Sequence, residues 1–158
     1  MKIEIKQPQG QIIVGKNGKA KLTWNPGFQQ KWQGKIDNAQ KFVDQECINK
    51  MKPYTPMITG MLHNSAITGT RIGSGKIHQI APYARYLYYG EVFGPNIPII
   101  RDGKIERFYS PPKKHPTGRE LKYSKSVNRN AGKLWFERMK ADHFKSILKG
   151  AQKHAERG

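Results

Sequence analysis

The segment Phe28–Met51 constrains the fold more than any other part of the chain. Its apolar residues recur at spacings of three and four, which places them along one stripe of an α-helix. They are Phe28, Trp32, Ile36, Ala39, Phe42, Val43, Cys47, Ile48 and Met51. Asn25-Pro26 precedes this helix, and Lys52-Pro53 ends it because the residue before a proline is driven out of helical backbone conformation. An apolar stripe of this length needs a covering layer, and we expect an antiparallel sheet to provide it.

The residues before this helix, 1–24, indicate a small β-meander. Met1–Lys6 alternates apolar and polar side chains, which is the period of a half-buried strand. Gln11–Val14 and Lys19–Trp24 are predicted as two further strands, joined by a turn at Asn17-Gly18.

The middle of the chain, residues 25–93, is predicted to complete the core. Thr55 or Thr59 caps a short segment that runs through Ser65. Ala66–Ile72 and Lys76–Ala81 are predicted to form a hairpin around Gly73-Ser74-Gly75, which adds strands to the sheet. Pro82–Tyr89 is predicted as a helix that stops at Gly90.

Residues 94–132 change in character to Pro, Gly, Lys, Arg, Ser and Asn. They contain one predicted hairpin, Ile97–Arg101 with Lys104–Tyr109, around the turn Asp102-Gly103. The remainder, including Pro111–Pro116, is expected to be a mobile basic loop. Two interpretations stay open: a solvated excursion, or an arm that becomes ordered against a neighbour or DNA. The candidate contacts of such an arm are Lys113, Lys114, Arg119, Lys122, Lys125 and Arg129.

Residues 133–158 are predicted as a C-terminal helix. Its apolar face carries Met139, His143, Ile147, Leu148 and Ala151. The sequence therefore predicts one α+β domain over residues 1–158: an antiparallel sheet of about four strands packed on one long helix, a short N-terminal β-meander and a C-terminal helix.

The charge of the chain is strongly positive. Its 29 Lys and Arg residues against 11 Asp and Glu give a formal net charge of +18 over 158 residues. Such a field favours polyanions, and on nucleic acid it acts through counterion release without sequence specificity. Self-repulsion between soluble copies, or acidic neighbours in a particle, explains the same balance, and charge alone does not decide between these interpretations.

The sequence offers no arrangement typical of an enzyme. The five histidines are scattered, and Cys47 is the only cysteine, which excludes a disulfide and a cysteine-built zinc site. The glycine-rich stretch around Gly73 lacks the Lys-Ser/Thr tail of a phosphate-binding loop. We therefore expect no catalytic residues, no metal and no cofactor. No signal pattern opens the chain and no apolar run reaches the length of a membrane span, so we expect no membrane contact and production in the cytoplasm.

The tyrosines between residues 83 and 91 exceed what one helix face can bury. Because Tyr83, Tyr86, Leu87 and Tyr89 cannot all face one core, at least one or two tyrosines are expected to be exposed or at an interface. The predicted interface residues are Tyr83, Arg85, Tyr86, Tyr89 and Glu91. Aromatic and basic residues so interleaved also suit stacking on bases, but the recognition sequence of an RNA-binding sheet is not present.

The order of short motifs resembles a known family. Thr55-Pro56, Thr59-Gly60, Leu62 and Ser65 are followed by Pro82-Tyr83-Ala84-Arg85-Tyr86 and Gly90-Glu91. This order resembles the small minor capsid proteins of tailed bacteriophages of Gram-positive hosts, and Met1–Lys6, Gly10–Ala20 and Leu134–His143 look like the same family. More distantly, the central block is similar to head–tail connector and tail-completion proteins. The resemblance covers most of the chain but not Gly94–Gly132. The matched positions are Thr59, Gly60, Leu62, Ser65, Tyr83, Ala84, Tyr86, Gly90 and Glu91.

The resemblance implies a structural virion component that works by assembly and not by catalysis. It implies contacts with other phage neck or capsid proteins and a homo-oligomeric ring at the portal vertex, assembled in the host cytoplasm. Whether the gene belongs to an active phage or to a defective prophage stays open. The alternative is a free, sequence-independent nucleic-acid-binding protein that uses its basic face.

Overall fold

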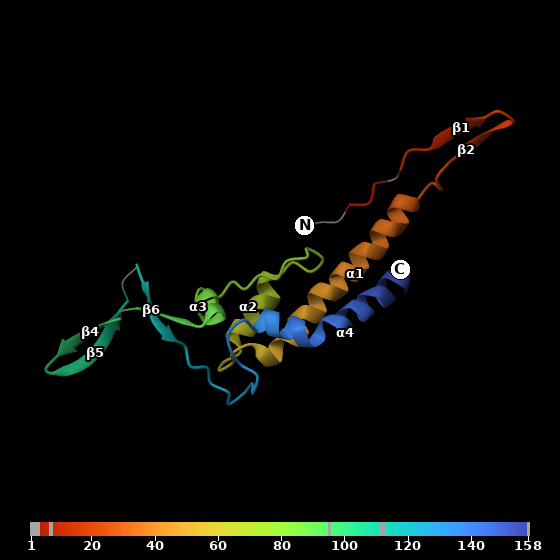
Figure 1. Cartoon of the computed structure of the whole chain (residues 1–158). Helices are drawn as coiled ribbons and strands as arrows, with labels where there is room; N and C mark the ends of the chain where they lie inside the picture. Colours follow the sequence, from red (N-terminus) through yellow and green to blue (C-terminus); the bar gives the residue numbers. More distant parts are fainter. Residues whose placement is uncertain (1–3, 7, 95, 111–112, 158) are drawn as a thin grey trace.

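Two long helices run antiparallel, side by side, and form the spine of the molecule in the computed structural model (Figure 1). They are α1 (Phe28–Met51) and α4 (Trp135–Arg157). A hairpin of β1 (Gln11–Gly15) and β2 (Gly18–Leu22) extends beyond the N-terminal end of α1. A second hairpin, β4 (Ile97–Arg101) with β5 (Lys104–Tyr109), lies at the opposite end of the molecule. The structure describes residues 4–6, 8–94, 96–110 and 113–157.

The core is small and lies where the two long helices meet the short ones. The short helices are η1 (Lys52–Tyr54), α2 (Met61–Gly69) and α3 (Ala84–Tyr89). Trp135 and Met139 of α4 are almost fully buried, and the ring of Trp135 meets that of Tyr88 edge to face at 4.8 Å between centroids. Buried residues of this cluster are Met51, Tyr54, Leu62, Ala66, Ala84, Trp135, Met139 and Ile147. The α+β class, the long helix with its predicted bounds and the C-terminal helix are confirmed.

The predicted hairpin over residues 66–81 is wrong, because residues 66–69 continue helix α2. Leu62, Ser65 and Ala66 are buried at a helical spacing, and the Thr68 hydroxyl donates to the Asn64 carbonyl oxygen at 3.0 Å. Residues 76–81 run extended without being part of a strand. Their contact with the end of α2 is made by a side chain: the Thr70 hydroxyl accepts from the backbone N–H of His78 at 3.0 Å.

The predicted four-stranded sheet is also wrong. The strands among the described residues form three separate antiparallel pairs: β1 with β2, β4 with β5, and β3 (Glu91–Gly94) with β6 (His115–Glu120). Helix α4 packs along α1 instead, since Trp135, Met139 and Ile147 give it an apolar face that covers the stripe of α1. The covering layer is thus a helix and not a sheet.

The two hairpins predicted from local turn sequences are confirmed. The hairpin around Asp102-Gly103 is confirmed, and both residues have the positive φ that a primed hairpin turn requires, +51° and +71°. The first hairpin is confirmed as β1–β2. The strand predicted over Met1–Lys6 is wrong for residues 4–6, which are not part of a strand, and Met1–Ile3 lie outside the described residues.

The basic loop predicted after the second hairpin is partly a strand. β6 pairs with β3, with His115 opposite Gly94 and Glu120 opposite Glu91, so this part of the prediction is wrong. Such pairing joins segments separated by a whole hairpin, which local sequence does not reveal. Residues 111–112 of the loop lie outside the described residues.

Candidate interaction surfaces

The tyrosines of α3 and Tyr83, which directly precedes it, divide between the core and the surface. Tyr88 turns inward against Trp135, whereas Tyr83, Tyr86 and Tyr89 expose 41%, 40% and 61% of their surface. The Tyr86 ring also meets Phe93 of β3 at 4.7 Å, which holds it in one place. The expected excess of exposed tyrosine is therefore present, as a row of rings with polar tips of the kind that protein interfaces favour.

The two charged residues predicted for the same surface flank these rings. Arg85 is exposed on α3, and Glu91 is half-buried at the start of β3. Within the helix, Ala84 is 6% exposed and forms part of the core. Arg85 and Glu91 therefore lie beside the tyrosines, whereas Ala84 serves the fold.

A groove of about 340 Å³ brings together motifs that are distant in sequence. We call it the 56–62 groove. Its walls are Pro56, Met57, Ile58, Thr59, Gly60, Met61, Leu62, Tyr83, Leu87, Lys122, Tyr123 and Ser124. Ile58 and Met61 stand on its rim with 84% and 65% of their surface exposed. Exposed aliphatic side chains beside an apolar groove are typical of a surface that meets another protein.

The 56–62 groove brings family-motif residues together with Lys122, which was predicted to lie on a separate basic segment. Thr59, Gly60 and Leu62 come from the first family motif, Tyr83 from the tyrosine block and Lys122 from the basic segment. Sequence reasoning missed Ile58 and Met61 as surface residues. The signal for them was present: apolar residues inside a Pro- and Gly-punctuated turn.

The remaining family-motif residues hold the fold together. Ser65 is buried and its hydroxyl donates to the Leu62 carbonyl oxygen at 2.7 Å. Gly90 ends α3 with φ of +76°, and a Cβ there would lie 2.9 Å from the Tyr123 hydroxyl oxygen. That hydroxyl donates to the Leu87 carbonyl oxygen at 2.6 Å, so it cannot easily move aside. Gly90 is therefore required by backbone conformation and by space.

A second apolar groove, of about 240 Å³, follows the seam between α1 and α4. We call it the seam groove. It is lined by Val43, Cys47, Phe136, Met139, Lys140, Phe144, Ile147, Leu148 and Ala151. Phe144 and Leu148 expose 54% and 47% of their surface, although the sequence placed Leu148 on the inward face. Burial and the nearby Asp44 and Glu46 raise the pKa of the Cys47 thiol, which disfavours a thiolate nucleophile at this position.

The six candidate basic contacts do not form one arm. Arg119 is part of β6, and Lys122, Lys125 and Arg129 are exposed along the segment that follows it. Lys113 is exposed, whereas the half-buried Lys114 donates to the Asn96 side-chain oxygen at 3.1 Å. The charges are thus spread over a strand and an extended segment on the outside of the molecule.

The glycine-rich loop at residues 73–75 is occupied by a carboxylate of the chain itself. The backbone N–H groups of Gly73 and Gly75 donate to Asp44 Oδ2 at 2.8 and 3.1 Å, and Gln40 donates to Oδ1 at 2.7 Å. Asp44 is 3% exposed. A phosphate-binding loop offers such N–H groups to its ligand, whereas here they bind Asp44 and fix the loop on α1.

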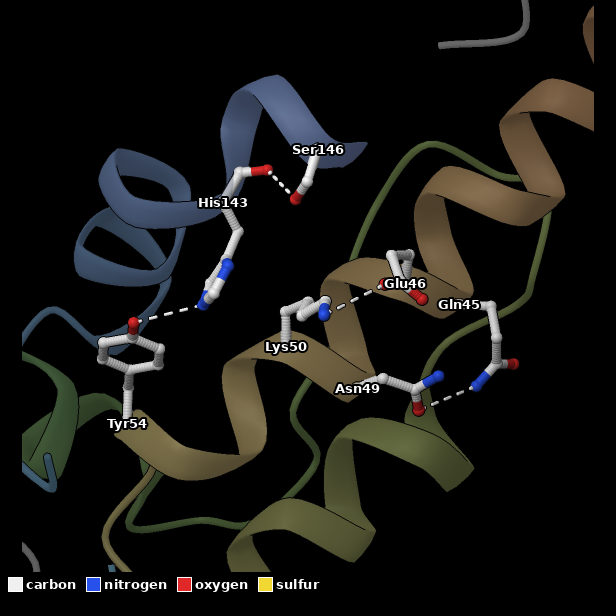
Figure 2. Close-up of polar contacts among 7 residues, drawn as sticks. All are labelled: Gln45, Glu46, Asn49, Lys50, Tyr54, His143 and Ser146. Atoms are coloured by element: carbon white, nitrogen blue, oxygen red, sulfur yellow. Dashed lines mark hydrogen bonds and ion pairs between the residues drawn. The ribbon is translucent and has the colours of Figure 1, made fainter. Parts of the chain in front are cut away.

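A polar cluster ties η1 to α4 (Figure 2). The Tyr54 hydroxyl donates to Asp142 Oδ2 at 2.6 Å and lies 3.3 Å from His143 Nε2, toward which it points in Figure 2. The hydrogen bond to Asp142, together with burial, raises the pKa of Tyr54. The hydroxyl is thus held as a donor, which suits a structural tie better than nucleophilic chemistry.

The described residues contain no group of three or more His, Cys, Asp or Glu side chains placed to hold a metal ion. Nor does any helix in this part of the chain have the length and apolar character needed to cross a membrane. Comparison of the chain with protein-family models, with curated proteins and with solved structures gives no match.

Proposed function

We propose that this protein is a structural subunit of a phage neck, a minor capsid or head–tail connector protein that acts through protein–protein contacts and not through catalysis. The order of sequence motifs supports this proposal, because several of the residues that carry the resemblance line the 56–62 groove or the tyrosine surface. Its copies form a ring at the portal vertex, together with other neck or capsid proteins, and assemble in the host cytoplasm.

The observation that carries the proposal is the size of the exposed surface. The chain exposes 12366 Å² for a mass of 18.1 kDa. A compact monomer of this mass exposes about 8,000 Å², so the chain carries an excess of roughly 4,000 Å². That excess lies in the range that permanent subunit interfaces bury. The exposed surface of the chain is therefore large enough for neighbouring subunits to cover in an assembly.

The hairpins account for part of this excess. Every residue of β1, β2 and β5 is exposed. An isolated two-stranded hairpin is marginally stable in water, and exposed apolar residues make it less suited to remain alone. These hairpins are therefore best explained as arms that reach other subunits.

Replacement of the exposed tyrosines tests the proposal in the particle. We expect Tyr86→Ser combined with Tyr89→Ser to lower the yield of tailed particles, counted by electron microscopy, without lowering the melting temperature of the isolated protein by more than a few degrees. Val127→Ser is the matched control, since Val127 is 56% exposed but lies away from these rings in the sequence. Normal assembly by the double variant would remove the tyrosine surface from the contact.

The charge of +18 favours a second candidate function, nucleic-acid binding by the free chain. This function requires tight binding that weakens steeply with salt. Lys113→Glu with Lys114→Glu should then weaken binding to DNA more than Lys16→Glu with Lys19→Glu in the first hairpin, as measured by fluorescence anisotropy. Equal effects of both pairs would show that only the overall charge matters for binding. If the Lys113 and Lys114 variant changes neither assembly nor DNA retention, the segment that carries these lysines is a solvated loop.

A further inference from the structure

The β4–β5 hairpin has one face made only of apolar side chains. Pro98 lies opposite Phe108, and Ile100 lies opposite Ile105. Since alternate residues of a strand share a face, these four side chains lie together. Pro98 is exposed, and Ile100, Ile105 and Phe108 expose 64%, 57% and 60% of their surface. This face is therefore unpartnered within the chain.

A register shift between Ile99 and Ile100 creates this face. Without the shift, Ile100 would lie opposite Glu106, and Ile105 would turn to the other side of the hairpin. The other side is mixed, with Ile99 opposite Arg107 and Arg101 opposite Lys104. The irregularity thus separates an apolar face from a mixed one, which carries all the charged residues of the paired strands.

The seam groove has the complementary character. Phe144 and Leu148 are half exposed and line the groove together with Val43 and Cys47. Among its walls, as far as the described residues go, Lys140 alone is charged. A neighbouring pocket shares Val43, Cys47 and Phe136 with it and extends toward Tyr88 and Trp135, although Gln40, Asp44 and Gln79 also line that pocket. A sheet face laid over a pair of helices is a common two-layer arrangement in α+β proteins, and here the chain supplies both layers without joining them.

The hairpin and the seam groove cannot meet within one copy as the chain is folded. Figure 1 shows the hairpin projecting away from the helices, beyond α3 and β3. A donor surface at one end of a molecule and an acceptor surface elsewhere on it give a head-to-tail contact between identical copies. The excess of roughly 4,000 Å² of exposed surface, part of which lies on this hairpin, leaves room for such a contact in every copy.

We propose that the apolar face of the β4–β5 hairpin of one copy packs on the seam groove of the next copy. This contact rests on the self-assembly contained in the proposed function and names the surfaces that carry it. Repeated from copy to copy, it closes into a ring if the rotation between neighbours permits.

The response to salt distinguishes this contact from nucleic-acid binding, because the two interactions change in opposite directions. Two copies of net charge +18 repel each other, whereas the four side chains that make the hairpin face are uncharged. Salt screens the repulsion and strengthens apolar association, so self-assembly grows with ionic strength. Binding to DNA weakens under the same change.

The single cysteine of the chain provides a direct test, because Cys47 lines the seam groove. We would place a second cysteine on the hairpin face, Ile105→Cys, and treat the full chain with a short bismaleimide at neutral pH. The incubation is long, because the raised pKa of Cys47 slows the reaction of its thiol. The expected product is a ladder of covalent multimers. Lys104→Cys, on the other face of the same hairpin, should give little product.

Ile105→Cys with Cys47→Ser carries one thiol per copy, so the reagent can join at most two copies. Almost no covalent dimer is expected, and any dimer that forms measures direct linkage between hairpins. The proposal is overturned if Lys104→Cys cross-links as well as Ile105→Cys, or if Ile105→Cys gives as much covalent dimer without Cys47 as with it and no higher multimers. A chain that stays monomeric by light scattering at all concentrations and at high salt overturns it as well.

A second pair of variants tests the contact without chemical modification. Ile105→Ser with Phe108→Ser should shift the chain from oligomer to monomer in light scattering while leaving its far-ultraviolet circular dichroism unchanged, since both side chains are exposed. Ile97→Ser with Tyr109→Ser, on the other face, should leave the oligomer intact. If the chain is found in phage particles but no cross-link forms, the contact is refuted and the proposed function stands. If the chain cross-links but is absent from particles, the proposed function is refuted and the contact stands.

Discussion

Replacing Asp44 with alanine should unfold the glycine-rich loop from α1 and destabilise the whole protein. The carboxylate accepts hydrogen bonds from Gly73, Gly75 and Gln40 at 2.8, 3.1 and 2.7 Å, and it is 3% exposed. Hydrogen bonds to a charged group contribute about 1.5–3 kcal/mol each when buried. Because Gly75 is exposed and water can replace one partner, we expect a total loss of about 3 kcal/mol.

For a chain of this size, that loss corresponds to a decrease in melting temperature of about 6–12 °C. The assay is thermal and urea unfolding followed by far-ultraviolet circular dichroism. Asp44→Asn is the matched control: one side-chain oxygen still accepts from the two glycines, and Gln40 can turn its own oxygen toward the new amide, so the expected loss is about 1 kcal/mol.

Two results would refute this reasoning. A loss below about 1 kcal/mol for Asp44→Ala would mean that water replaces the carboxylate at no cost, so that Asp44 does not fix the loop. Equal losses for the alanine and asparagine variants would mean that the negative charge, and not the set of hydrogen bonds, holds the loop in place.

Three further predictions concern stability. Gly90→Ala should lower the free energy of unfolding in urea by about 2–3 kcal/mol, because φ at Gly90 is +76° and a Cβ would lie 2.9 Å from the Tyr123 hydroxyl oxygen. Gly34→Ala in α1, where a Cβ would meet nothing within 4 Å, should raise it by about 0.5–1 kcal/mol. Equal effects of the two substitutions would contradict this reasoning. Burial lowers the pKa of His63, so its contribution to stability is complete above its ordinary pKa of 6.5 and is lost as the pH falls through the lowered value; His63→Leu should flatten that acid slope in urea unfolding. Tyr54 has a raised pKa, so its contribution to stability is complete below its ordinary pKa of 10.0 and is lost as the pH rises. Tyr54→Phe should lower the free energy of unfolding by about 1–2 kcal/mol at neutral pH and flatten its decrease at alkaline pH. An unchanged alkaline decrease would exclude Tyr54 as its source.

Elements fixed by local chemistry were predictable from sequence. The proline at position 53 and the apolar spacing before it mark the end and the face of α1, and Asp102-Gly103 specifies a hairpin turn whatever surrounds it. Helix α2 was misassigned beyond Ser65, because its extent is decided by burial of Leu62 and Ala66 against other elements. The β3–β6 pair was missed because its two strands are separated in the sequence by a whole hairpin, so no local pattern indicates that they pair.

The candidate surfaces show the same division. Composition sufficed to predict that tyrosines near Tyr86 are exposed. No pattern in the sequence indicates that Lys122 and Thr59 line one groove, or that Phe144 and Cys47 line another, because those neighbours are set by how α3 and α4 pack. Single residues were therefore identified by their chemistry, whereas the surfaces they form required the fold.

The most direct test of the proposed function is the copy number of the chain in purified phage particles from the strain that carries its gene. Quantitative mass spectrometry would count this protein against the major shell protein of the same particles. The account predicts a low and constant ratio, as expected of a component present in one ring per particle. Complete, tailed particles that lack the protein would contradict the account and leave salt-sensitive nucleic-acid binding as the function to pursue.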